Sequence, residues 1–500
     1  MRTLALAVAC VAALAGNALA QDAKTVIANA QKALGDVKSI TYSGSAKDVS
    51  FQQCGANSTD MQCRGTHDPM RPINNYVRVI DLAGPTSRAT GSTNNIGAGG
   101  STTLAAGTYF QQVTPQQANV AQPWNNSLEL YLTPWGFLKG AADNNATATR
   151  RKVDGKNYTV LTWSPAVKAP SGKSYTINGY VNDQNLVERV ETWLGENIMG
   201  DMQIVATYSG WKQFEAAMAP TKIVQTRGGW PFFEVNVTSA KANPSDVASI
   251  APAPAPAGGG RAGGPGGPPP ALMVTTEKLG DGIYRLTTGP GSYDSVVVEF
   301  KDYVMMLEAG QSIARGQAYI AKTKELFPNK PIRYVMNTHP HSDHTGGLPV
   351  LVAEGATIIT QQNNKAFLEK ALNTPRTLLD DPLAKNPKPA KIETVAEKKV
   401  YSDGTRTVEM YHTWPVPHSN GLMIAYLPKE KILFQGDFSL PAKGQPANDH
   451  VKALAPIVLD KLKLDFQRYI NVHTSAQPET REDFVAAVEA RKKADGATTK

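Results

Sequence analysis

Apolar and polar positions change their period along the chain and divide it into two halves of different character. In residues 23–36 the apolar side chains recur at helical spacing and Gly35 ends the run, which predicts a short helix. Later segments alternate or are rich in β-branched residues between turn residues, as strands are. The last five of them follow one another closely and predict an antiparallel meander. The expected strands are residues 39–51, 75–84, 175–183, 186–194, 202–211, 221–229 and 232–241, with a short helix at 132–141.

The second half mixes strand patterns with helical ones. Strand patterns cover residues 282–289, 295–302, 303–310, 332–338, 356–362, 407–414, 422–428 and 431–438, and helical patterns cover 314–327 and 364–372. Strands and helices in this mixture predict a layered α/β domain.

The two halves are separated by an Ala-, Pro- and Gly-rich stretch, residues 251–272, which has almost no side chains with which to build a core. Such a composition predicts an extended and then flexible tether. The expected organisation is therefore a β-rich domain of residues 21–250, the linker, and an α/β domain of residues 273–500.

The first twenty residues have the pattern of a cleaved signal peptide. Arg2 supplies a positive start, residues 4–15 are apolar but too short to span a bilayer, and residues 18–20 form a small-residue cleavage site. No later stretch offers about 20 unbroken apolar residues, so no membrane span is predicted. The expected location is the periplasm or the exterior. In that oxidising space Cys54 and Cys63 are expected to form a disulfide bond.

The composition narrows the class of partner. The chain is 41% hydrophobic and 19% charged, which is typical of globular proteins. Its 51 Lys and Arg against 43 Asp and Glu give a mild formal charge of +8, and these charges are scattered. No basic block that would bind nucleic acid is present, so a small-molecule partner is favoured.

The histidines are the main candidates for a chemical role in this chain. The chain has eight histidines, and three of them stand with an aspartate in "HPHSDH", residues 339–344, directly after the apolar strand 332–338. Alternate residues of an extended loop point the same way, so two of the imidazoles can converge on one ion. Four potential ligands so close together crowd a single tetrahedral ion, which favours a pair of metals. Three further candidates each end a strand or occupy a Pro- and Gly-framed loop downstream: His418, Asp437 and His473.

These motifs, "HPHSDH", "PVPHSNG", "FQGDF" and "NVHTS", resemble those of the metallo-β-lactamase superfamily over residues 273–500. The resemblance implies an αββα sandwich with the metals at one edge, between the two sheets. It assigns His339, His341 and His418 to one zinc ion, Asp343, His344 and His473 to a second, and Asp437 to both.

The sequence departs from the superfamily pattern in two places. An aspartate is common at an early strand end, where this chain has Glu308, and that glutamate is expected to support the metal loop from behind. The terminal histidine is commonly framed by glycines, whereas His473 stands between Val472 and Thr474.

The resemblance implies hydrolysis, with two Zn²⁺ ions acidifying a shared water that Asp343 also orients; iron or a mixed pair is left open. The substrate classes implied are an ester, lactone, thioester, β-lactam or related bond. The catalytic half has no cysteine and it has Asp437, which disfavours a dedicated β-lactamase. Among the other polar residues, Lys443 is interpreted as a surface lysine, His412 as a packed or hydrogen-bonded residue and His450 as part of a solvated loop, while His67 lies in the other domain.

Two alternatives remain open from the sequence. One is an oxidoreductase of the persulfide dioxygenase type within the same superfamily, which uses a single iron. The other is a ligand-binding protein that acts through residues 21–250.

Overall fold

The computed structural model describes residues 23–48, 70–95, 105–113, 123–247, 272–289, 293–473 and 479–498. The predicted signal peptide, the predicted Cys54–Cys63 disulfide, His67 and residues 251–271 of the predicted linker lie outside them.

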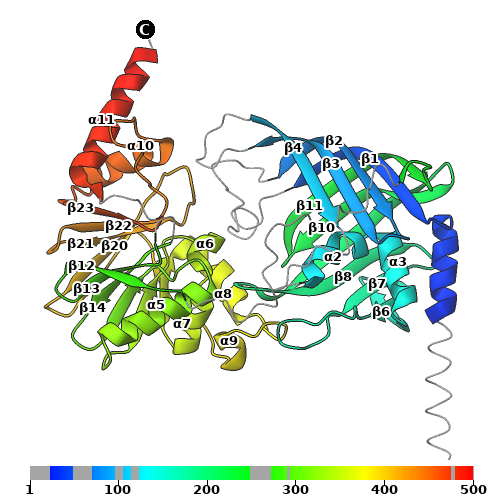
Figure 1. Ribbon diagram of the computed structural model, residues 1–500, viewed down its shortest axis with the longest axis horizontal. Coiled ribbons are helices and arrows are strands. Elements are labelled where there is room, and N and C mark those ends of the chain that lie inside the picture. Colours follow the sequence, from blue (N-terminus) through cyan, green and yellow to red (C-terminus); the bar gives the residue numbers. More distant parts are fainter. Residues whose placement is uncertain are drawn as a thin grey trace, which may run out of the picture.

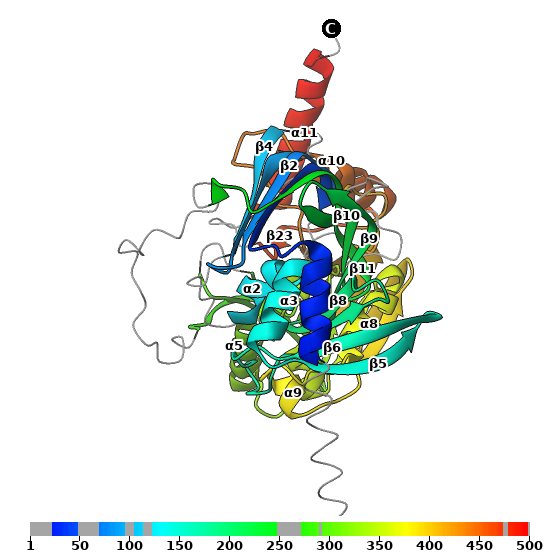
Figure 2. The same ribbon diagram turned by 90° about the vertical axis from the view of Figure 1, so that its right-hand side faces the viewer.

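The N-terminal unit is built on one curved antiparallel sheet, with the predicted helix at residues 23–34 at its start (Figures 1 and 2). The strand order is β4-β3-β2-β1-β11-β10-β9-β8-β7-β6-β5, so the predicted meander is confirmed and continues to β5. The strands are β1 (Ser39–Asp48), β2 (Arg71–Asp81), β3 (Thr86–Asn95), β4 (Ala105–Val113), β5 (Thr147–Val153), β6 (Lys156–Trp163), β7 (Ile177–Val181), β8 (Val187–Glu196), β9 (Gly200–Phe214), β10 (Ala217–Arg227) and β11 (Trp230–Ala242).

Two helices, α2 (Pro123–Tyr131) and α3 (Pro134–Asp143), pack against this sheet. The Thr133 hydroxyl accepts a hydrogen bond from the Gly136 amide at 3.1 Å and so caps α3, which confirms the helix expected at residues 132–141. Trp124 and Phe137 are buried beneath the strands. Burial of such large aromatic rings is the main source of stability in this core.

The C-terminal unit contains two sheets. The first has the order β12 (Thr275–Gly280), β13 (Ile283–Thr287), β14 (Ser295–Glu299), β15 (Val304–Leu307), β16 (Ile332–Met336), β17 (Thr357–Gln361) and β18 (Lys391–Val395). The second has the order β19 (Lys398–Ser402), β20 (Thr407–His412), β21 (Met423–Leu427), β22 (Ile432–Gln435), β23 (Arg468–Asn471) and β24 (Glu479–Thr480).

The two sheets pack face to face, with helices outside them. Met336 and Ile359 of the first sheet join Phe434 and Ala425 of the second in one buried apolar cluster. The first sheet is covered by α5 (Ile313–Leu326), α7 (Leu348–Glu354) and α8 (Lys365–Asn373), and the second by α10 (Asp449–Ala455), η3 (Pro456–Lys461) and α11 (Arg481–Thr498). The expected αββα sandwich is confirmed. None of the helices in the described part of the chain has the length and apolar character needed to cross a bilayer.

The two units are in direct contact. The Asp201 carboxylate, at the start of β9, accepts hydrogen bonds from the backbone amides of Thr377 and Leu378 at 2.8 and 2.9 Å. The ring of Trp230 meets that of Phe367 edge to face, with centroids 5.6 Å apart. The segment that follows α8 therefore docks the sandwich onto the N-terminal sheet.

A buried ion pair fixes this docking segment. The Arg376 Nε lies 3.1 Å from Asp381 Oδ2, and the same guanidinium donates to the Asn197 carbonyl of the N-terminal unit at 2.6 Å. Arg376 and Asp381 are both buried. A buried guanidinium that pairs with a carboxylate and also caps carbonyls across an interface satisfies most of its donors at once.

Arg376→Ala is expected to lower the free energy of unfolding by roughly 3–5 kcal/mol, because Asp381 is left as an uncompensated buried charge. Tryptophan fluorescence during denaturant unfolding measures this, since six of the seven tryptophans lie in the N-terminal unit. The matched control is Lys385→Ala, which removes an exposed ion pair with Asp380 and should change the free energy by less than about 1 kcal/mol. Equal effects of the two substitutions would contradict the role given to Arg376.

Candidate metal centre

The histidine cluster begins where β16 ends. Met336 is the last residue of the strand, and the Asn337 side-chain amide then donates to the carbonyls of His339 at 2.8 Å and His344 at 3.1 Å. This amide holds both ends of the loop together. His341 starts the short helix α6 (Ser342–Thr345), which turns Asp343 and His344 back toward His339.

The glycine pair after the cluster lets the loop approach its neighbour closely. A Cβ atom at Gly346 would lie 1.8 Å from the Gln311 carbonyl oxygen, and one at Gly347 would lie 2.0 Å from that of Ala309. No side chain fits at either position. The two glycines therefore press the metal loop against the end of β15.

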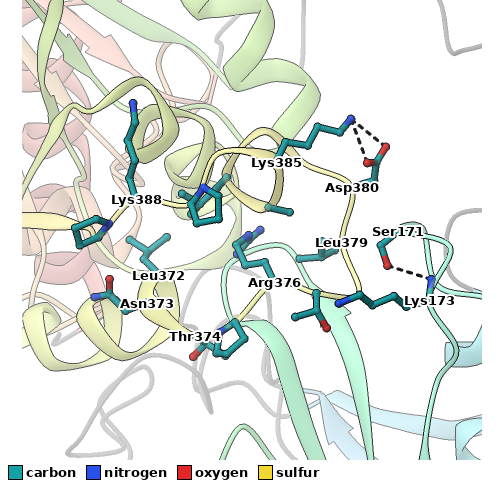
Figure 3. A pocket seen from close by; sticks show the side chains of 16 residues that line it. Ser171, Lys173, Leu372, Asn373, Thr374, Arg376, Leu379, Asp380, Lys385 and Lys388 are labelled. Carbon is teal, nitrogen blue, oxygen red and sulfur yellow. Dashed lines mark hydrogen bonds and ion pairs between the residues drawn. The ribbon is translucent and has the colours of Figure 1, made fainter.

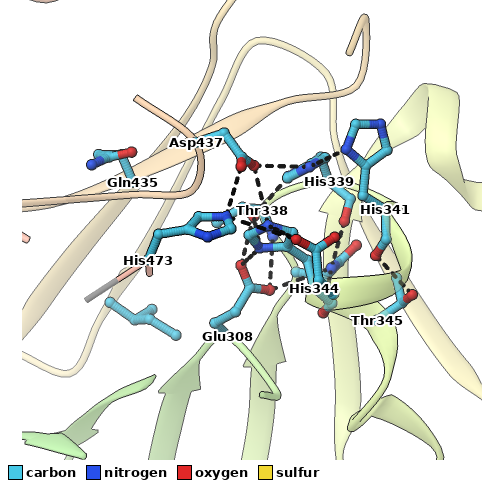
Figure 4. Close-up of polar contacts among 12 residues, drawn as sticks. Glu308, Thr338, His339, His341, His344, Thr345, Gln435, Asp437 and His473 are labelled. Carbon is cyan, nitrogen blue, oxygen red and sulfur yellow. Dashed lines mark hydrogen bonds and ion pairs between the residues drawn. The ribbon is translucent and has the colours of Figure 1, made fainter. Parts of the chain in front are cut away.

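The structure brings all seven candidate ligands together (Figure 4 labels five of them). Ligand atoms of His339, His341, His418 and Asp437 lie within 4.8 Å of one another, and so do those of Asp343, His344, Asp437 and His473. Asp437, which follows β22, belongs to both groups. These are the two sets that the resemblance implied.

The Asp437 carboxylate lies at the centre of the cluster. Its Oδ2 is 3.1 Å from the Nε2 atoms of both His339 and His344 and 3.2 Å from that of His418, while Oδ1 is 2.7 Å from His473 Nε2. One carboxylate thus faces imidazoles of both groups.

Several of these atoms are buried, and their close contacts with one another do not have the geometry of hydrogen bonds. They are Asp343 Oδ1, His344 Nε2, Asp437 Oδ2 and His473 Nε2. Buried polar groups are costly unless they are hydrogen-bonded or coordinate a metal. Imidazole nitrogens and carboxylate oxygens grouped in fours fit a pair of zinc-type ions.

Glu308 supports the centre from behind, as expected from the sequence. Its buried carboxylate Oε2 accepts from the Thr338 hydroxyl at 2.6 Å and lies 2.9 Å from His344 Nδ1. This contact directs the Nε2 lone pair of His344 into the cluster. Glu308 has a φ of 75°, a backbone conformation that residues with side chains rarely adopt. The strain is consistent with a carboxylate whose position matters.

Burial and mutual charge set the protonation of the cluster. Burial lowers the pKa of His339 well below its usual value, and the neighbouring His344 and His341 lower it further. Burial opposes ionisation of Asp437, but His344, His418 and His339 outweigh it and hold that pKa well below its usual value. Burial likewise opposes a charged His344, yet the Asp437 and Glu308 carboxylates raise its pKa well above normal. A metal ion at His344 must therefore displace a proton.

Tyr293 is a site residue that sequence reasoning missed. Its ring lies 4.7 Å from the His473 ring and 6.2 Å from the His344 ring, centroid to centroid. Burial, followed by the carboxylates of Asp343 and Asp437, raises the pKa of the Tyr293 phenol to about 12. Tyr293 therefore stays protonated at neutral pH, with a hydroxyl available as a hydrogen-bond donor next to these carboxylates. No motif marks a tyrosine that precedes β14.

The structure also tests the predictions made for His412, His450 and Lys443. His412 is hydrogen-bonded to the Asn420 carbonyl at 2.8 Å, as predicted, and Lys443 is exposed. The solvated loop predicted for His450 is wrong. His450 is buried in α10, and its ring packs on that of His418 with centroids 5.1 Å apart. The residues before His450 have no helical pattern, so neither α10 nor the contact between His450 and His418 could be predicted from the sequence.

Part of the chain is similar to known proteins. Residues 288–472 match the family model described as the metallo-beta-lactamase superfamily. Among similar solved structures, a metallo-beta-lactamase from Pontibacter korlensis has 16% identity and a TM-score of 0.34, with 44% of this chain and 99% of that chain covered. The metallo-beta-lactamase FIM-1 from Pseudomonas aeruginosa, in a mono-zinc form, has 18% identity and a TM-score of 0.33, with 45% and 98% covered.

Glu308→Gln is expected to weaken metal binding at the Asp343–His344–Asp437–His473 group by about 10–100-fold, because His344 loses a charged partner. Competition of the protein with a chromogenic chelator for Zn²⁺ measures this. Glu325→Gln, on the exposed face of α5, is the matched control and should leave the affinity unchanged. An unaltered affinity in the Glu308 variant would show that the carboxylate only fills space.

Proposed function

We propose that this chain, which carries a domain of the metallo-β-lactamase superfamily in residues 288–472, is an exported dinuclear zinc hydrolase of small molecules. The observation that supports the proposal is the pair of four-ligand groups that share Asp437. The superfamily consists mostly of hydrolases, and a single-iron enzyme has no need of a second complete group.

His339, His341 and His418 would hold one zinc ion, Asp343, His344 and His473 the other, and Asp437 would contact both. Zinc ions bound there supply a water of lowered pKa and an electrophile that polarises the scissile bond. The protein fixes the ligands before substrate arrives, because Glu308 and Asn337 hold the loop from the buried side.

The substrate is expected to approach from the side of His473. The side chain of His473 is 30% exposed, and those of Asp437 and Asp343 are 16% and 14% exposed, whereas His339 and His344 are fully buried. Asp343 is therefore close to solvent, and we propose that the protonated phenol of Tyr293 donates to its carboxylate. This places its carboxylate where it can accept a proton from an attacking water and keep that water oriented.

The residues of the two ligand groups guide the choice of substrate class. No cysteine is available in residues 273–500 to replace a carboxylate ligand, and Asp437 stands between the two groups. An ester, lactone or thioester of a small molecule is the substrate class we propose, with β-lactam turnover as a side activity. The proposed location is the periplasm or the exterior, on the strength of residues 1–20.

The experiment that tests the proposal combines a metal count with a substrate panel on the mature full-length protein. Two zinc ions per chain and hydrolysis of an ester, lactone, thioester, β-lactam, sulfate or phosphodiester are the expected results. One iron per chain together with oxygen consumption would favour the dioxygenase reading instead. A metal-replete protein that hydrolyses nothing in the panel would refute the hydrolase.

Asp437→Asn is expected to reduce turnover at least about 100-fold and to leave the fold intact. The asparagine amide is neutral, so it cannot supply negative charge to the two ligand groups as the carboxylate does. Steady-state kinetics on the metal-replete protein and circular dichroism are the measurements. Asp460→Asn, at an exposed position of η3, is the control. Full turnover by the Asp437 variant would remove the shared carboxylate from the mechanism.

Tyr293→Phe keeps the ring on His473 and removes only the hydroxyl that we propose donates to Asp343. Because hydrogen bonds to charged groups contribute roughly 1.5–3 kcal/mol, kcat is expected to fall by about 10–100-fold. The measurement is the kcat and KM of the variant with its zinc content determined in parallel. A normal kcat would mean that Asp343 keeps its orientation without the phenol.

A further inference from the structure

A cavity separate from the metal centre lies where the two units meet. Its volume is about 700 Å³, and none of its lining residues is one of the seven candidate metal ligands. Ser171 and Lys173 of the N-terminal unit line one side, and residues 372–389 of the sandwich line the rest. Figure 3 shows the two sets of side chains around Arg376. The volume is in the range of cavities that bind small molecules.

The inner wall of this interdomain cavity is apolar. Leu372, Leu379 and Leu383 are buried side chains that line it, and prolines of the 372–389 segment complete the wall. A wall of this kind favours a hydrocarbon body, which gains roughly 25 cal/mol for each Å² of apolar surface removed from water.

The polar part of the cavity carries an excess of positive charge. Four cationic side chains line it against the carboxylates of Asp380 and of Asp381, which lies behind Arg376. Asp381 pairs with Arg376, and Asp380 pairs with Lys385 at 3.1 Å. In the part of the chain that the structure describes, neither Lys173 nor Lys388 has a carboxylate within 4.0 Å of its ammonium. Lys388 donates instead to the Ala353 carbonyl at 2.5 Å.

The walls are held in place without a ligand. The backbone of Thr377 and Leu378 is fixed by Asp201 of the N-terminal unit, and the Asp201 amide donates to the Pro375 carbonyl at 2.7 Å. A molecule in the cavity can therefore contact both units without the cost of assembling them.

We propose that the interdomain cavity binds an amphipathic monoanion, a medium-chain carboxylate or sulfonate. The alkyl chain lies against Leu372, Leu379 and Leu383, and the anionic head lies near Lys173, whose ammonium has no carboxylate partner among the described residues. The site is independent of the metal centre, so its occupancy does not require the proposed hydrolase activity.

Titration calorimetry of the full-length protein with decanoate, below its micelle concentration, tests the proposal. One decanoate per chain is expected to bind, and decyltrimethylammonium, which has the same chain and the opposite charge, is expected not to bind. Lys173→Glu should weaken decanoate binding at least tenfold, whereas Lys301→Glu, at an exposed lysine elsewhere, should not. Thermal unfolding verifies that the variants are folded.

Binding by Asp437→Asn with unchanged affinity separates this site from the metal centre. Absence of decanoate binding at millimolar concentration would overturn the proposal. Equal binding of the anion and the cation, or unchanged decanoate affinity in the Lys173→Glu variant, would overturn it as well.

Discussion

The Asp437 carboxylate is the interaction on which the C-terminal half depends. It lies within 3.2 Å of imidazole nitrogens from both ligand groups, and these imidazoles come from three separate segments of chain, the 339–344 loop, His418 and His473. Parallel pairing of β15 with β16 and of β22 with β23 brings the ends of these strands to one edge of the sandwich. Ligand sites usually form at such edges in layered α/β folds. The sandwich therefore brings together, at one edge, the polar residues that directly follow its strands.

Crowding so many polar atoms in a buried place requires support from outside the cluster. The carboxylate of Glu308 and the amide of Asn337 provide it by hydrogen bonds, and Gly346 and Gly347 provide it by allowing the loop to touch the 309–311 backbone. Three of these residues occupy positions with a strict backbone requirement. A Cβ would clash at either glycine, and a backbone with φ of 75° is strained at Glu308.

The ligands could be found in the sequence because their residue types are rare and their spacing is fixed by the chemistry. Eight histidines in 500 residues make a cluster of three conspicuous, and the strands that precede them have clear apolar patterns. Tyr293 and Thr338 could not be found in this way, since their roles arise from contacts across the sandwich. Strands β3 and β5 were also missed, because their sequences are largely polar and give no alternation. The docking between Arg376 and Asn197 joins residues 179 apart, and no local pattern reports it.

The contact between the two units gives the N-terminal sheet a physical relation to the metal centre. Trp230 packs on Phe367 of α8, and Asn364, which directly precedes that helix, donates to the Gly421 carbonyl at 2.8 Å. Gly421 belongs to the loop that carries His418, and a Cβ there would lie 1.9 Å from Asn364 Oδ1. The helix that the N-terminal unit packs against is thus the one that holds this ligand loop. A sheet attached in this way acts as part of the scaffold of the centre, which argues against a separate binding module loosely tethered to an inactive domain.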